Sequence, residues 1–234
     1  MNCKSYLGKK CPDSIKGSRV HLSAVVCLCW MLWPGVALAQ PIFPRLPPIQ
    51  TSSEALKPGS WVNYSIVLRK SGRKMTLRLA ALQKEDDAQW FEMSVHYPSG
   101  QGLILKTLLK GSLSTFHKPL KTVLQILGQQ AFYLPPGAGS AQLPSFQSPK
   151  DFKARRVTKG KLKVPAGIFS VEKYHRVEKG RVTQIWLSQE LPGWPMIKLL
   201  SPSLHLELLA HGTAAKSQIK GQPVEISGDD LTGF

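Results

Sequence analysis

The stretch WVNYSIVLRKSGRKMTLRLAALQ, residues 61–83, carries two runs of alternating apolar residues on either side of Ser71-Gly72. Alternation with a period of two places the apolar side chains on one face of an extended strand, and a Gly-containing turn between two such runs is typical of a β-hairpin. The stretch therefore predicts antiparallel strands over 61–70 and 73–83.

The segments after this hairpin continue the same pattern. QWFEMSVHY (89–97) and LILKTLLK (103–110) are further apolar runs, joined by the turn sequence PSGQG (98–102). Four antiparallel strands that follow one another in the sheet are the simplest arrangement of these runs.

The second half of the chain also consists of strand-like runs. Gly-marked turns are expected at Lys159-Gly160, Ala166-Gly167 and Lys179-Gly180. No alternation of strands with helices occurs, so a doubly wound parallel sheet is not expected. The later strands are expected over 194–201 and 203–212, with 217–227 as a last edge.

One segment has helical spacing. Its apolar residues follow an i, i+3, i+4, i+7 pattern, and Gly128 is suited to end a helix. We therefore expect a helix from Lys118 to Leu127. The apolar residues of this stripe are Leu120, Val123, Leu124 and Leu127.

These elements predict a mainly β protein: a curved antiparallel sheet (half-barrel) of about 9–11 strands with one short helix. A long loop rich in Pro and Gly, residues 133–149, is expected to cover the sheet. The expected organisation is a signal peptide (1–39), an extended Pro/Ser-rich lead-in (40–58), one half-barrel domain (59–227) and a flexible tail (228–234).

The N-terminus has the composition of a secretory signal. Five Lys and Arg residues precede the uncharged run LSAVVCLCWMLW (22–33), and Ala37-Leu38-Ala39 is a small-x-small cleavage sequence. Pro34-Gly35 keeps the apolar run shorter than the roughly 20 residues that span a bilayer. We expect cleavage after Ala39 and a periplasmic or secreted protein.

Cleavage there would remove every cysteine, because Cys3, Cys11, Cys27 and Cys29 all precede Ala39. Disulfides and zinc–thiolate sites are then excluded. The chain has a net charge of +17, and loss of five basic residues and one acidic residue leaves about +13. An exported protein does not meet genomic nucleic acid, so the charge indicates an acidic envelope partner or an anionic membrane surface.

The succession KVPAGIFSVEKYHRVEKGRVTQIWLSQELPGWPMIKL (163–199), followed by LHLELLAHG (204–212), carries a family resemblance. It resembles the C-terminal half of secreted Gram-negative bacterial proteins of unknown function, in which a "vPaGtF" turn, a strand ending in "vWyS" and a "vPGW" loop precede two closing strands. Those proteins are similar in outline to the LolA/LolB-like lipoprotein carriers. The resemblance implies a curved half-barrel around an apolar cavity closed by helices, of which this chain is expected to have one.

Residues 164–176, VPAGIFSVEKYHR, contain the strongest catalytic candidates, Glu172 and His175. Alternation along a strand places these two side chains on opposite faces, which excludes an acid–histidine pair unless a bulge intervenes. Glu172 and Arg176 are expected to form an exposed pair on one face. Phe169, Val171 and Val177 are expected to face the interior.

Other catalytic patterns are absent from the sequence. No H-x-H or H-E-x-x-H spacing occurs, and no G-x-S-x-G nucleophile elbow. We expect no metal site, no cofactor and no enzymatic activity.

Large apolar residues occur in many of the expected strands. Most are expected to be core, and the alternative is that one concave face stays open to a lipid or a lipidated partner. On that alternative, the residues expected to form the cavity wall are Trp61, Trp90, Phe91, Phe169, Val171, Val177, Trp186 and Trp194.

The run KDFKARRVTKGKLK (150–163) holds seven basic residues and one acidic residue. It is either a solvated strand pair that protects a sheet edge or a docking surface for anionic lipid or an acidic partner. The residues of the docking alternative are Lys153, Arg155, Arg156, Lys159, Lys161 and Lys163.

The sequence thus predicts a non-catalytic periplasmic or secreted protein that binds or carries an apolar ligand, a lipid or lipidated partner, on the concave face of a β-sheet. The alternative is an envelope assembly or structural protein that binds another protein through the same sheet.

Overall fold

The structure is a computed structural model of the 234-residue chain. The chain divides into two units, Met1–Pro41 and Ile42–Phe234, and every residue described below lies in the second. The predicted signal peptide (1–39) and tail (228–234) lie outside the described residues. The described residues are 49–50, 56–111, 119–135, 146–147, 154–191 and 193–225.

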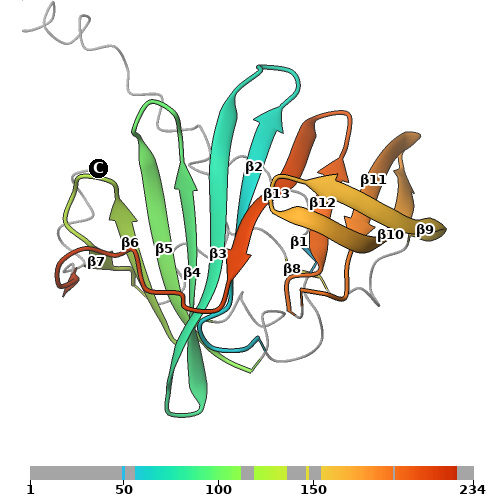
Figure 1. The fold of residues 1–234 in the computed structure, drawn as a ribbon. Coiled ribbons are helices and arrows are strands. Elements are labelled where there is room, and N and C mark those ends of the chain that lie inside the picture. The colour runs from blue at the N-terminus through green and yellow to red at the C-terminus, as the bar shows by residue number, and fades with distance from the viewer. Residues whose placement is uncertain are drawn as a thin grey trace, which may run out of the picture. The chain divides into compact units, whose positions relative to one another are not determined.

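The described residues form strands and contain no helix (Figure 1). Two strands of two residues each, β1 (Ile49–Gln50) and β8 (Phe146–Gln147), pair in parallel. The other twelve strands form one sheet, and they are β2 (Trp61–Leu68), β3 (Lys74–Glu85), β4 (Ala88–His96), β5 (Gly102–Lys110), β6 (Lys121–Ile126), β7 (Phe132–Tyr133), β9 (Arg155–Val164), β10 (Gly167–Glu178), β11 (Arg181–Leu187), β12 (Met196–Leu200), β13 (Leu204–Gly212) and β14 (Val224–Glu225).

The sheet is open. Its order is β14-β7-β6-β5-β4-β3-β2-β13-β12-β11-β10-β9, and every ladder is antiparallel except β14–β7. The predicted mainly β fold with a meander through β2, β3, β4 and β5 is confirmed, with twelve strands in place of the expected 9–11. β14 and β9 end the sheet, so its two edges belong to distant parts of the chain.

The core lies on one face of the sheet, the inner face. Buried residues face one another across three neighbouring strands, β13, β2 and β3. One row is Leu206, Ile66 and Met75, and the next is Leu208, Tyr64 and Leu77. The hydroxyl of Tyr64 donates a hydrogen bond to the Met196 carbonyl at 3.0 Å. Complete burial raises the pKa of Tyr64 far above its usual value.

The predicted helix at Lys118–Leu127 is wrong. Residues 121–126 form β6, antiparallel to β5, and Leu120 of the expected buried stripe is 57% exposed. Thr122, Val123 and Gln125 are all buried although they lie on both sides of the strand. A strand buried on both faces shows no simple alternation, so its few apolar residues also fit a helical stripe.

The turn predicted at Lys159-Gly160 is also wrong, whereas those at Ala166-Gly167 and Lys179-Gly180 are confirmed. Gly160 lies inside β9 and pairs with Val171 of β10. A Cβ atom built on Gly160 would meet nothing within 4 Å. This glycine is therefore an open position in a strand and not a chain reversal.

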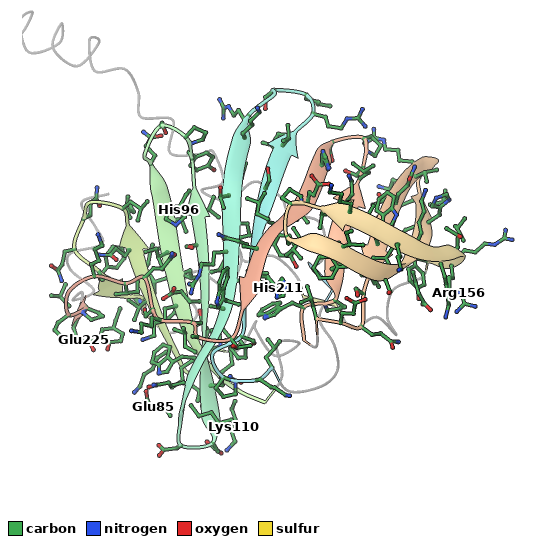
Figure 2. All side chains as sticks on the ribbon, viewed as in Figure 1. Glu85, His96, Lys110, Arg156, His211 and Glu225 are labelled. Atoms are coloured by element: carbon green, nitrogen blue, oxygen red, sulfur yellow. The ribbon has the colours of Figure 1, made fainter. Side chains whose placement is uncertain are left out.

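The β9–β10 hairpin folds back toward the middle of the sheet (Figure 1). At its turn, the Ala166 amide donates to the Leu208 carbonyl of β13 at 3.3 Å. Phe169 and Val171 are buried in the core cluster, and the Phe169 ring meets His211 edge-on at 5.8 Å between centroids. The core thus holds the tip of the hairpin, and Arg156 lies at its other end (Figure 2).

After β13 the chain crosses the opposite, outer face of the sheet. This segment, residues 213–225, is called the strap. The expected last edge strand over 217–227 is confined, among the described residues, to the two residues of β14, which pair with β7. Most of the strap is held by side chains, as described below.

Candidate binding surface at the basic end of the sheet

The terminal strand β9 is exposed along most of its length. Every residue from Arg155 to Lys161 is exposed, and in the described part of the chain β9 has a ladder only with β10. A terminal strand presents unpaired backbone N–H and C=O groups along its free edge. The structure therefore places hydrogen-bonding backbone and accessible side chains together at β9.

Three lysines lie on one side of β9. The β10 register pairs Lys159 with Glu172, Lys161 with Ser170 and Lys163 with Ile168. Alternate residues of a strand repeat every 6.6 Å or so, which gives a line of exposed ammonium groups, the lysine row. Within the described residues, Lys161 and Lys163 form no ion pair.

Glu172 supplies the negative charge at one end of this row. Its carboxylate lies 2.7 Å from Lys159 Nζ and 3.5 Å from Arg156 Nη1, and it accepts a 2.5 Å hydrogen bond from the Tyr174 hydroxyl. The Lys159 bond, followed by the Tyr174 bond, lowers the pKa of Glu172. Burial and the hydrogen bond to Glu172 raise the pKa of Tyr174.

A β-bulge brings Arg156 to this carboxylate. Lys173 pairs with Thr158 and Tyr174 pairs with Arg156, so Val157 is an extra residue in β9. The extra residue reverses the alternation, and Arg156 joins the side that carries the lysine row. Without the bulge Arg156 would point to the opposite side.

The predicted Glu172–Arg176 pair is not formed. Arg156 and Lys159 of β9 are the ion-pair partners of Glu172, and Arg176 pairs with Glu178 at 3.2 Å. Residues four apart on a strand are about 13 Å apart, whereas cross-strand neighbours are about 5 Å apart. The β10–β11 register does place Glu172 and His175 on opposite sides, as alternation predicts.

The positive charge of the lysine row extends over the neighbouring strands. Residues 154–187, which include β9, β10 and β11 and are called the basic end, contain nine Lys and Arg and two Glu, a net charge of +7. On the side of β10 opposite Glu172, Lys173 Nζ lies 4.9 Å from the centre of the Trp186 ring. Both faces of the basic end therefore present cations.

The eight residues predicted to line an apolar cavity are distributed over different surroundings. Four of them, Phe91, Phe169, Val171 and Trp194, are buried members of the core cluster. Val177 is 68% exposed. The remaining three are half-buried tryptophans, each beside a cation: Trp61 beside Arg78, Trp90 beside Lys106, and Trp186 beside Lys173.

The residues predicted for basic docking do come together. Arg155, Arg156, Lys159, Lys161 and Lys163 are all exposed residues of β9, and Lys153 lies outside the described residues. Figure 2 shows Arg156 at the end of the hairpin.

Sequence reasoning missed a polar cluster beneath the strap. The Glu92 side chain has no exposed surface and pairs with Arg78 at 3.0 Å. It also accepts hydrogen bonds from the Ser217 hydroxyl at 2.6 Å and from the Gln218 amide at 3.0 Å. Glu92 occupies a polar position in an alternating strand, and its sequence pattern is that of a solvent-facing residue.

Further contacts extend this attachment along the strap. Ser94 donates to the Gln218 side chain at 2.6 Å. Gln125 accepts from the Lys220 amide at 2.9 Å and donates to the Lys220 carbonyl at 3.0 Å. The strap thus covers part of the outer face of β4 and β6 and is held there by hydrogen bonds. The Glu92 carboxylate is fully engaged by these contacts and by Arg78.

Within the described ranges, no group of three His, Cys, Asp or Glu residues is placed to hold a metal ion. The same ranges include no helix long and apolar enough to span a membrane.

No protein-family model and no curated protein matches the sequence. Several solved structures match the fold loosely. A hypothetical protein from Chlamydia trachomatis has a TM-score of 0.42 at 11% identity, over 71% of this chain and 93% of that one. A protein from Bacteroides fragilis, described as exported and YmcC-like in fold, has a TM-score of 0.34 at 10% identity, over 71% and 100%.

The MucA/MucB complex of Pseudomonas aeruginosa has a TM-score of 0.35 at 13% identity, over 70% of this chain and 55% of the matched one. We draw no functional argument from superpositions this loose.

Proposed function

We propose that this chain is a non-catalytic protein of the bacterial cell envelope that binds an acidic segment of another protein at its basic end. The observation that carries the proposal is the lysine row on an exposed terminal strand, in which Lys161 and Lys163 have no ion-pair partner among the described residues. The export-signal pattern of residues 1–39 supports the location.

The distribution of charge favours recognition over simple protection of the edge. One or two lysines suffice to discourage strand pairing at a sheet edge. Here the excess extends over three strands and gives residues 154–187 a net charge of +7. A field of one sign over such an area attracts an oppositely charged partner and speeds its association.

A protein partner accounts for the geometry better than a lipid carried within the sheet. Phe91, Phe169 and Trp194 of the expected cavity wall are 3–5% exposed and pack in the core cluster. An acyl chain would have to displace these contacts, whereas an acidic segment meets side chains that are already accessible. A lipid or lipidated partner remains the competing outcome of the experiment below.

The proposal includes no reaction. Glu172 is engaged by Lys159, Arg156 and Tyr174, and His175 points to the other side of β10. A general base needs a substrate proton within hydrogen-bond reach, and these groups face no common point.

Site-specific photo-cross-linking in intact cells tests the proposal. The cross-linker replaces Lys161 in one variant and, as the matched control, Lys70, an exposed lysine in the β2–β3 turn. We expect one dominant protein adduct from position 161 and none of it from position 70. Lys161→Glu together with Lys163→Glu should abolish the adduct formed from a cross-linker at exposed Thr158.

Two outcomes would refute the proposal. One is the same set of adducts from positions 161 and 70, which would mean that the basic end selects nothing. The other is an adduct with lipid and no protein, which would favour the apolar-ligand hypothesis.

A further inference from the structure

The free edge of β9 suggests how an acidic segment would bind, an inference that rests on the proposed function. We propose that the partner adds to the sheet as an extended strand beside β9, with acidic side chains at every second residue facing the lysine row. The occupant is thus an acidic peptide segment of a partner protein in β conformation.

The spacing of charges favours this mode of binding. Lys159, Lys161 and Lys163 project from one side of β9 with the two-residue repeat of a strand. A strand paired with β9 has the same repeat, so carboxylates at i, i+2 and i+4 each face one lysine. A helix or a compact acidic patch cannot match three charges with this spacing as closely.

The other side of β9 also suits an added strand. A side chain at Gly160 would meet nothing within 4 Å, and the neighbouring Leu162 is half-buried against the core. A large apolar or aromatic residue of the added strand can cover this space, as aromatic residues do beside edge glycines. The expected motif therefore alternates acidic residues with apolar residues.

The β9 strand of a second copy of this chain is not a suitable added strand. β9 contains five Lys and Arg and no acidic residue. Pairing of two β9 strands would bring like charges together on the same face, and such cross-strand pairs are destabilising.

The two Asp-Asp pairs of this chain do not have the required spacing of acidic residues at every second position either. Asp86-Asp87 and Asp229-Asp230 are adjacent residues, so the two carboxylates of each pair point to opposite faces of a strand. No three acidic residues of the sequence stand at i, i+2 and i+4, so a strand with that spacing must come from another protein.

Defined peptides test the inference by calorimetric titration against the purified full chain. The first is an eight-residue peptide with three glutamates alternating with valine and tyrosine, and the second has the same composition with the glutamates consecutive. One favourable cross-strand charge pair changes affinity about 1.5- to 5-fold, so we expect the alternating peptide to bind roughly tenfold more tightly.

Backbone pairing is tested with two N-methylated forms of the alternating peptide, each methylated at one set of alternate amides. Alternate N–H groups of a strand point to opposite edges, so only one set can donate to β9. We expect one form to lose binding and the other to retain most of it. Lys161→Gln with Lys163→Gln should weaken the alternating peptide at least several-fold, whereas Lys70→Gln should not.

The possible results separate this inference from the proposed function. Equal affinity for the two peptides, equal effects of the two methylated forms, or no binding of either peptide overturns strand addition. If the protein adduct from position 161 persists in any of these cases, the proposed function stands and only the mode of binding is wrong. Loss of that adduct overturns both.

Discussion

Replacement of Glu92 by alanine should destabilise the protein far more than loss of an exposed carboxylate. The side chain of Glu92 has no exposed surface, and that of its partner Arg78 is 11% exposed. The substitution leaves the Arg78 guanidinium without its carboxylate beneath the strap and removes the acceptor for Ser217 and Gln218.

The size of the effect follows from these contacts. Removal of one partner of a buried ion pair costs about 3–5 kcal/mol, because the remaining charge stays desolvated. Hydrogen bonds to a charged group contribute about 1.5–3 kcal/mol each, but they are not additive with the ion pair. We therefore expect Glu92→Ala to lower the free energy of unfolding by about 3–5 kcal/mol, a large part of the roughly 5–15 kcal/mol typical of a folded protein.

Glu92→Gln removes the charge of the side chain while keeping its shape, so it measures the contribution of the charge alone. The amide keeps the volume, and its oxygen can accept from both Arg78 and the Gln218 N–H while its NH2 group donates to the Ser217 hydroxyl. The Arg78 guanidinium loses only the opposite charge. We expect about 1.5–3 kcal/mol of destabilisation, between wild type and Glu92→Ala.

Urea unfolding measures both free energies, and hydrogen exchange measures the local consequence. The amide of Gln218 donates to Glu92, whereas that of Lys220 donates to Gln125. In Glu92→Ala we expect the Gln218 amide to lose its protection first. The matched control is Glu85→Gln, because Glu85 also accepts two hydrogen bonds, from Lys121 and Trp90, but its side chain is 42% exposed.

The reasoning would be refuted if Glu92→Ala and Glu85→Gln unfolded at similar urea concentrations. That result would mean that the strap is held by its backbone pairing and not by the buried carboxylate.

Two further predictions concern a turn and the basic end. Gly59→Ala should lower the melting temperature more than Gly72→Ala. Both glycines have a positive φ, which costs an alanine about 1–2 kcal/mol. Of these two positions, only at 59 would the added Cβ also clash with a backbone carbonyl, that of Thr213. Equal losses in the two variants would contradict this. Because its pKa is lowered, Glu172 stabilises the β9–β10 pair above its usual pKa of 4.5, and the contribution is lost as pH falls through the lower folded value. An NMR titration of the Glu172 carboxyl should give a midpoint below 4.5 that rises in Lys159→Ala, and an unchanged midpoint in that variant would show that Lys159 does not set it.

Strands in which buried and more exposed residues alternate could be predicted from the sequence. β2 is the clearest case, since its buried and half-buried residues alternate along Trp61–Leu68. β6 could not be predicted in this way, because the strap covers its outer face and buries Gln125 while the core buries Thr122 on the other side. The covering segment is about a hundred residues away, so no local pattern signals it.

The candidate surface was predicted in composition but not in geometry. The basic run 150–163 was expected to be solvated, and its Lys and Arg residues on β9 are exposed, whereas 150–153 lie outside the described residues. Its arrangement into a row depends on the register with β10, and the position of Arg156 depends on the bulge at Val157. Both are set by pairing between strands, which a single sequence does not reveal.

The strap also has a consequence for the order in which the chain folds. Its contacts are to Arg78 on β3, Glu92 and Ser94 on β4, and Gln125 on β6, groups that come together only when these strands have paired. Residues 138 positions apart, Arg78 and Lys216, meet in this way at 3.2 Å. Contacts of such sequence separation are costly to form early because a long loop must close first. The strap is therefore expected to dock late, so that weakening it speeds unfolding while leaving the folding rate nearly unchanged.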